Sequence, residues 1–215
     1  MDAVFSQFDL VLKAFLLTIE LFVIAGVLSL VLGTLLAAAR VGPVAVLSRA
    51  GALYVTLVRS TPLLIIFIFV FFGLPQMDIH LPFLVKGVLS LTFYTASFVC
   101  EAIRSGINAV SVGQAEASRA IGLTFGQSMR YVVLPQALRA VVPPLASVLI
   151  ALAKNTSVAA GFGLLEATAR MRYFTNDQAD ARTWIFLTFA LGYIIIVELI
   201  SAGAGSLERR WKVAR

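Results

Sequence analysis

The sequence predicts an all-α membrane protein with about five transmembrane helices and its N-terminus outside the cell. The first observation is composition: the 215 residues are 60% hydrophobic and only 13% charged, with a mean hydropathy of +0.96. A soluble domain carries about a quarter charged residues, so this chain cannot cover a surface that faces water. The other two observations are the length of the apolar runs and the positions of the basic residues between them.

Five runs are long enough to be membrane spans, because a helix needs about 20 mostly apolar residues to cross the hydrocarbon core. The expected spans are residues 15–39, 53–74, 83–108, 141–165 and 184–206, within one transmembrane domain over residues 1–215. The fourth run is interrupted by Pro143, Pro144 and Lys154. We expect the two prolines to break this helix, which is tolerated at membrane depth where protein or a water-filled cavity satisfies the backbone.

Orientation follows from the arginines and lysines of the short loops, which gather on the cytoplasmic side of a membrane. Basic residues follow the first expected span, recur between the third and fourth, and end the chain in the tail 208–215. All of these lie on one side if the N-terminus is outside. The formal charge of +6 then indicates contact with the lipid of the inner leaflet and not a nucleic-acid partner.

The segment 112–135, between the third and fourth spans, is too polar to enter the membrane. Residues 114–121 favour a short helix that Gly122 ends in the left-handed conformation. Residues 123–133 favour a second helical piece, and Pro135 marks the turn into the next span. Such an elbow suits docking into a groove on a cytoplasmic partner. Alternatively, Glu116 and Arg119 simply pair with each other along the helix.

The elbow resembles the EAA loop of ABC-importer permeases. Its matching residues are Glu116-Ala117-Ser118, Gly122, Val132 and Leu134-Pro135, with serine and valine where the family pattern has alanine and isoleucine. Five segments are similar to permeases of the polar amino-acid branch, and residues 101–121 most resemble its glutamate-type members. These segments are Arg59-Ser-Thr-Pro-Leu-Leu64, residues 94–107, Gln114-Ala-Glu-Ala117, Leu134-Pro-Gln-Ala-Leu-Arg139 and Lys154-Asn-Thr-Ser157.

This resemblance implies a translocation subunit, not an enzyme, in the plasma (inner) membrane. Its implied partners are a cytoplasmic ABC ATPase, a second permease of the same or similar sequence, an extracytoplasmic amino-acid-binding protein and membrane lipid. ATP and magnesium belong to the ATPase, since this chain has no Gly-x4-Gly-Lys-Ser/Thr segment and we expect no cofactor in it. The residues that the resemblance assigns to the ATPase contact are Gln114, Glu116, Ala117, Arg119 and Gly122.

Ionisable residues inside a span are candidates for function, because they are expensive in hydrocarbon. The first group is Lys154 with Asn155, Thr156 and Ser157, which is either a polar patch on the translocation path or an internal contact that holds a gate. Glu101 and Arg104 are three residues apart and form either a structural pair or part of the path. Arg59, near the expected inner interface, either snorkels to that interface or takes part in the path or gate.

Two other classes of membrane protein remain as alternatives. One is half of a secondary transporter with a broken helix, although this does not explain the polar elbow. The other is an integral-membrane enzyme, but the sequence shows no metal-ligand cluster or set of catalytic residues at a suitable depth. Within the importer class, the substrate is glutamate or another polar amino acid such as glutamine, arginine or histidine.

Overall fold

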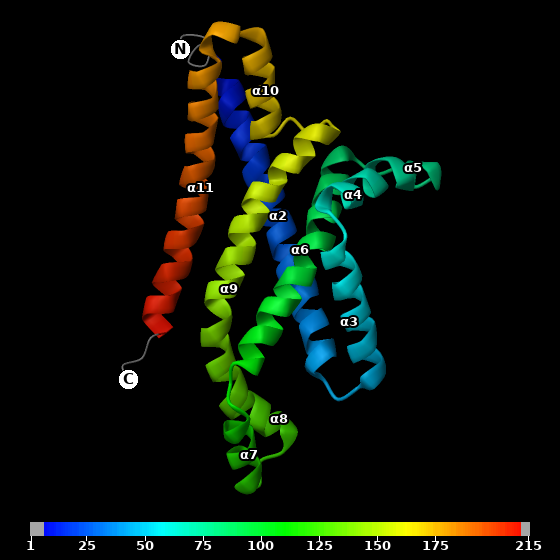
Figure 1. The fold of residues 1–215 in the computed structure, drawn as a ribbon, viewed down its shortest axis with the longest axis vertical. Coiled ribbons are helices and arrows are strands. Elements are labelled where there is room, and N and C mark those ends of the chain that lie inside the picture. The colour runs from blue at the N-terminus through cyan, green and yellow to red at the C-terminus, as the bar shows by residue number, and fades with distance from the viewer. Residues whose placement is uncertain (1–6, 212–215) are drawn as a thin grey trace.

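The computed structural model describes residues 7–211, and within that range the secondary structure is entirely helical. Four long helices run along the molecule, and a small helical elbow projects from one end (Figure 1). The last four residues of the basic tail lie outside the described residues. The four long helices are α2 (Phe8–Val41), α6 (Phe83–Asn108), α9 (Leu134–Asn155) and α11 (Arg182–Trp211).

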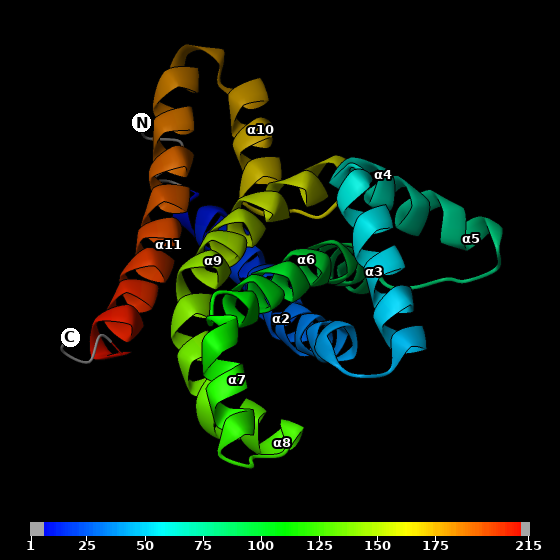
Figure 2. The ribbon, with the colours of Figure 1, turned by 60° about the horizontal axis from the view of Figure 1, so that its bottom comes forward.

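Four helical stretches of the described chain are long and apolar enough to cross a membrane: Phe8–Val41, Phe83–Asn108, Phe125–Phe162 and Ala179–Arg209. A fifth span is present if the bent pair Ala45–Ser60 and Leu63–Gln76 counts as one. The N-terminal end of α2 and the elbow lie at opposite ends of the molecule (Figures 1 and 2). The architecture is therefore that of a multi-pass membrane protein.

The second expected span, 53–74, is divided between two helices that meet at 101°. Helix α3 (Ala45–Ser60) ends before Pro62, whose ring excludes the helical conformation from the residue that precedes it. Thr61 accordingly has extended backbone, with φ −100° and ψ 129°. After the bend come α4 (Leu63–Ile68), a π-helical turn Phe69–Gly73, and α5 (Leu74–Gln76), which extend away from the bundle (Figure 1).

The prolines near the fourth span do not break it, and the two expectations placed on them are wrong. Pro143 and Pro144 lie inside α9, which continues through both. Pro135 does not turn the chain either. It lies in the first turn of α9, which follows directly from α8 (Phe125–Ser128) and the π turn Met129–Val133. A π turn lets the helix continue where proline removes a donor and crowds the preceding turn.

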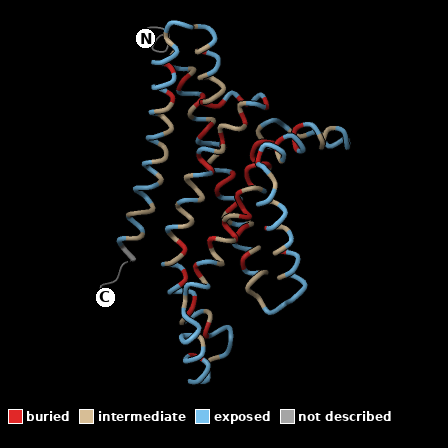
Figure 3. The backbone as a smooth tube through the Cα atoms, viewed as in Figure 1, coloured by how far each residue is buried: buried red, intermediate tan, exposed pale blue. Residues whose placement is uncertain are grey.

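The core lies where α2, α6 and α9 meet, and buried residues gather along this seam (Figure 3). Gly33 makes the close approach of α2 to α6 possible: a Cβ there would lie 2.5 Å from the Val99 side chain. Leu21, Leu91 and Leu152 are fully buried at the same seam. Small residues that let helix backbones approach are the usual packing device in membranes.

The remaining elements cap the end of the bundle away from the elbow. Helix α9 tightens into a 3₁₀ segment, Thr156–Phe162, which Gly163 ends with a φ of 87°. Helix α10 (Ala167–Asp177) and the short turn Ala179–Ala181 then lead into α11. The ring of Phe15 on α2 stacks on Phe189 at 5.6 Å, which fixes the start of α11 to the bundle.

Candidate functional site

The elbow consists of α7 (Val112–Ala120) and α8, joined by a tight turn at Gly122. Gly122 has a φ of 86°, the left-handed conformation that its sequence position predicts. Its N–H donates to the Arg119 carbonyl at 2.9 Å, and the next N–H, of Leu123, donates to Ser118 at 3.1 Å. These bonds satisfy carbonyls at the end of α7 and reverse the chain direction.

Side-chain hydrogen bonds order the elbow, and one of them joins its two helices. The hydroxyl oxygens of Ser118 and Ser128 are hydrogen-bonded at 2.7 Å, and both side chains are buried. Thr124 begins α8 with a reciprocal cap, in which its hydroxyl accepts the Gln127 N–H and its own N–H donates to the Gln127 side chain. Ser118, which departs from the alanine of the family pattern, is therefore the connection between the two helices.

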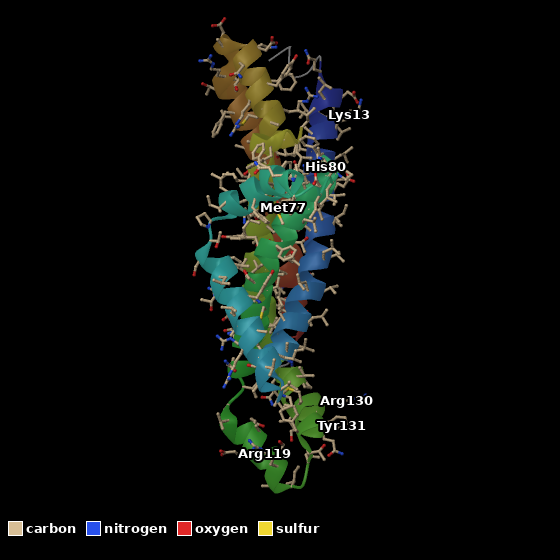
Figure 4. The ribbon with its side chains drawn as sticks, turned by 90° about the vertical axis from the view of Figure 1, so that its right-hand side faces the viewer. Lys13, Met77, His80, Arg119, Arg130 and Tyr131 are labelled. Atoms are coloured by element: carbon tan, nitrogen blue, oxygen red, sulfur yellow. The ribbon has the colours of Figure 1, made fainter. Side chains whose placement is uncertain are left out.

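All five residues expected at the ATPase contact are exposed: Gln114, Glu116, Ala117, Arg119 and Gly122. Within the described chain no ion pair joins Glu116 to Arg119; the Arg119 side chain donates to the Ala115 carbonyl at 3.4 Å instead. The charges of α7 are thus available to a partner. Arg119 lies with Arg130 and Tyr131 at the end of the molecule opposite Lys13 (Figure 4).

The elbow also exposes large apolar side chains, which the sequence interpretation missed. Val112 is 69% exposed, Ile121 78% and Phe125 61%. Phe125 and Arg119 line a hollow of about 270 Å³ between α7 and the start of the fourth span. Exposed apolar groups beside unpaired charges are typical of a protein–protein contact. Their signal in the sequence was only that isolated apolar residues interrupt a polar segment.

The second group of predicted residues meets around Glu101. Arg104 donates three hydrogen bonds to the Glu101 carboxylate, the shortest at 2.8 Å to Oε2, and Arg40 pairs with Oε1. Arg59 approaches the same carboxylate, with its Nη1 at 3.8 Å. The sequence predicted the Glu101–Arg104 pair but not Arg40, which lies 61 residues away along the chain.

The third group is divided by the end of α9. Thr156 is buried and its hydroxyl donates to the Ala153 carbonyl, while that of Ser157 donates to the Lys154 carbonyl. Lys154 is exposed, and no ion pair to it exists within the described chain. Lys154 and Ser157 line a hollow of about 260 Å³ with residues of α10 and α11. Asn155 ends α9 and does not line that hollow.

Glu166 is a buried acidic residue that the sequence did not single out. Its side chain accepts the Thr168 and Ala169 N–H groups at the start of α10, each at 3.0 Å. The Tyr193 hydroxyl on α11 donates to it at 2.7 Å. Burial raises the pKa of this carboxyl, although these donors act in the opposite direction. The Thr18 hydroxyl on α2 also donates to it at 3.5 Å. Glu166 therefore joins three elements, a role that sequence spacing does not reveal.

Lys86 is a second buried charge that the sequence did not reveal, because it is a single lysine within an apolar run. Its side chain is 7% exposed, its ammonium donates to the Phe71 carbonyl at 3.4 Å and lies 5.6 Å from the centres of the Phe71 and Phe83 rings. Aromatic faces attract cations, which accounts for a buried lysine without a carboxylate.

Relatives of known description cover nearly the whole chain. The glutamate transport system permease protein GluC of Corynebacterium glutamicum is 38% identical, over 95% of each chain. The probable glutamine ABC transporter permease protein GlnM of Bacillus subtilis is 36% identical, over 96% of this chain and 95% of its own. A crystal structure of an amino acid ABC transporter with histidines has a TM-score of 0.89 at 25% identity, covering 97% of both chains.

A more distant solved structure, the MetNI methionine ABC transporter in an inward-facing conformation, shares the fold with a TM-score of 0.77 at 22% identity, covering 97% of this chain and 99% of its own. Residues 29–213 match the family described as the inner membrane component of binding-protein-dependent transport systems. With the apolar helices and the exposed elbow, these matches agree with the resemblance drawn from the EAA-type loop. The chain therefore belongs to the family of inner membrane components of binding-protein-dependent transport systems.

Proposed function

We propose that this chain is the permease subunit of an ATP-driven importer that moves a polar amino acid, with glutamate as the first candidate, across the inner membrane. The observation that carries the proposal is the elbow, which presents unpaired charges and exposed apolar side chains on a projection from the bundle (Figure 4). A separate ABC ATPase, with its ATP and magnesium, docks on Gln114, Glu116, Ala117, Arg119 and Gly122. The elbow is then cytoplasmic and the N-terminus outside.

Transport follows from two states of the complex. Closure of the ATPase dimer on ATP moves the elbow, and the continuous helix from α8 to α9 carries that movement into the membrane. Coupling of this kind requires one structural element whose two conformations respond to both the ATPase and the substrate site. This helix can be that element, because it reaches from Phe125 at the elbow to Lys154. Substrate arrives from an extracytoplasmic binding protein and leaves on the side of the elbow.

The exposure of Lys154 supports the proposal that a second permease subunit lies beside this one. A lysine near the centre of a membrane helix costs ~2.5–3.5 kcal/mol on insertion scales, and Lys154 is exposed within the span Phe125–Phe162. Its ammonium must face water or a partner, not lipid. A translocation path between two permease subunits provides that environment, and Lys154 with Ser157, Glu101, Arg104 and Arg59 are its candidate residues.

The names of the relatives support the substrate class. Two glutamate transport permeases, from Corynebacterium glutamicum and Corynebacterium efficiens, are 38% and 39% identical to this chain. Relatives named for glutamine and arginine are 36% and 29% identical. Another polar amino acid is therefore the second candidate. Uptake of labelled glutamate, glutamine and arginine into proteoliposomes that contain the assembled complex discriminates between them.

The docking proposal is tested by charge reversal on the elbow. Glu116→Lys is expected to abolish co-purification of the ATPase and transport while the chain still inserts, because it places a cation where the partner meets a carboxylate. Asp177→Lys is the matched control: the same charge change at an exposed position on α10, away from the elbow. Normal co-purification and transport by Glu116→Lys would refute the assignment of this face.

A further inference from the structure

Arg59 differs from the two other arginines around Glu101 in how it is bonded. Arg40 and Arg104 hydrogen-bond to the two carboxylate oxygens of Glu101. Arg59 lies 3.8 Å from one of these oxygens and donates no hydrogen bond within the described chain. Its side chain is 45% exposed, and the guanidinium lies 5.2 Å from the centre of the Phe98 ring. One carboxylate thus faces three cations, and Arg59 keeps its donors free.

The free donors of Arg59 line a hollow of about 390 Å³ between α2, α3 and α6. Thr56 and Ser60, one turn apart on α3, line it too, and their hydroxyls form no hydrogen bond within the described chain. The hollow therefore combines two hydroxyls without acceptors, the ring of Phe98 and the Arg59 guanidinium, which forms an ion pair but no hydrogen bond with Glu101. Arg40 and Glu101 also line it. A guanidinium fork matches the geometry of a carboxylate, and hydroxyls add further donors.

The position of the hollow, beside an interrupted membrane helix, also indicates a ligand-binding site. Arg59 and Ser60 are the last two residues of α3, directly before the 101° bend at Pro62. Transporters form substrate sites where membrane helices are interrupted, because such places expose polar groups inside the bilayer. A guanidinium whose nearest acceptor lies 3.8 Å away, beside two free hydroxyls, is unfavourable against hydrocarbon, so this hollow must contain water or an anionic group.

We propose that Arg59, with Thr56 and Ser60, binds the carboxylate on the α-carbon of the transported amino acid. The inference rests on the proposed function and extends it to a site within this subunit. Glu101 cannot provide this interaction, because its carboxylate repels an anion and is already occupied by Arg40 and Arg104. Its role is to hold the positive charges together, which leaves Arg59 as the group that meets the substrate.

The test is equilibrium binding of labelled glutamate, glutamine and arginine to the purified permease–ATPase complex without its binding protein. Arg59→Gln is expected to weaken binding at least tenfold for every amino acid that the wild type binds. Thr56→Val and Ser60→Ala are expected to weaken it several-fold. Arg172→Gln is the matched control, because Arg172 is an exposed arginine on α10 that lines neither this hollow nor the one at Lys154. Co-purified ATPase and a single elution peak establish that each variant is folded.

Competition with the α-carboxamide of the same amino acid identifies the group that Arg59 recognises. The wild-type complex is expected to reject the amide strongly, whereas Arg59→Gln is expected to lose most of this discrimination. Unchanged discrimination in the variant would overturn the assignment while leaving the importer function intact. A wild-type complex that retains its ATPase but binds none of the amino acids would overturn the proposed substrate class together with this site.

A phospholipid phosphate is the other anion that a membrane supplies. Repeating the binding in nanodiscs with and without anionic lipid distinguishes the two sources. The proposal requires that Arg59→Gln weakens amino-acid binding equally in both. If amino-acid binding does not change and the variant loses only retention of anionic lipid, the hollow is a lipid site and the proposal is wrong.

Discussion

Gly122 and Glu166 show how differently single residues reveal their roles. Gly122 could be predicted from sequence, because a glycine after a short polar helix is the usual way to end it in the left-handed conformation. Glu166 could not, because its partners Thr18 and Tyr193 lie on α2 and α11, far apart along the chain. Arg40 escaped notice for the same reason. Local backbone geometry is determined by neighbouring residues, whereas the partners of a buried charge come from elements that are distant in the sequence.

Gly122→Ala is expected to weaken the elbow by roughly 1–2 kcal/mol, the cost of the left-handed conformation for a residue with a Cβ. No atom of a non-neighbouring residue in this chain lies within 4 Å of the added Cβ, so conformational strain is the only cause within the permease itself. Gly126→Ala is the control, since its surroundings are equally open but its backbone is helical. The measurement is ATPase recovered with each permease variant; equal recovery from both would show that the turn is not needed for docking.

Glu166→Gln is expected to change the pH dependence of stability. Burial raises the folded-state pKa of Glu166, so the folded chain binds this proton more tightly than the unfolded chain. The resulting stability is fully present below the unfolded pKa, about 4.3, and is lost as pH rises through the folded pKa. The Tm of the wild type minus that of the variant should therefore fall as the pH rises above about 4. Melting in detergent measures it, and a difference that grows with pH would contradict this assignment.

At the scale of elements, sequence identified the long apolar helices but not how prolines act on them. Pro62 ends α3, yet Pro143 and Pro144 lie within an unbroken α9. Two prolines, Pro75 and Pro135, each follow a five-residue π turn and a leucine. Whether a proline ends a helix depends on whether the preceding turn can widen and on what packs around it, and local propensity does not contain this information.

Ser118→Ala is expected to loosen the elbow, because it leaves the buried Ser128 hydroxyl without its partner. An unsatisfied buried donor costs about 1–3 kcal/mol. Replacing both serines by alanine should recover much of the loss, since neither hydroxyl then remains buried alone. Limited proteolysis of the elbow in the purified complex measures the effect. A double variant cleaved faster than Ser118→Ala would show that the serine pair is not what joins α7 to α8.

For the whole molecule, hydropathy and the family-like segments predicted the fold class and the family, because both are properties of long stretches of chain. The arrangement of the three polar groups required coordinates: Arg59 and Glu101 share one hollow, and Lys154 lines another. The expected second span was also divided by a bend that hydropathy cannot detect. Sequence therefore named most of the site residues but not which of them act together.

The orientation of the chain leads to a labelling prediction. With the buried Cys100 replaced by alanine, a cysteine placed at His80 should react with a membrane-impermeant thiol reagent on intact cells. A cysteine placed at Gln127 on the elbow should react only after the membrane is opened, because basic loops remain in the cytoplasm. The reverse pattern would invert the topology and exclude a cytoplasmic ATPase at the elbow.

The hydrogen bonds of the elbow bear on how such permeases diversify. Each one within residues 111–128 joins positions at most ten apart, as the Ser118–Ser128 bond does. A segment built from local contacts forms quickly and depends little on the rest of the chain. The elbow can consequently be exchanged as a unit. Transferring this short stretch between two permeases is expected to make one permease bind a different ATPase. Natural recombination has the same opportunity to pair an existing substrate path with a new ATPase.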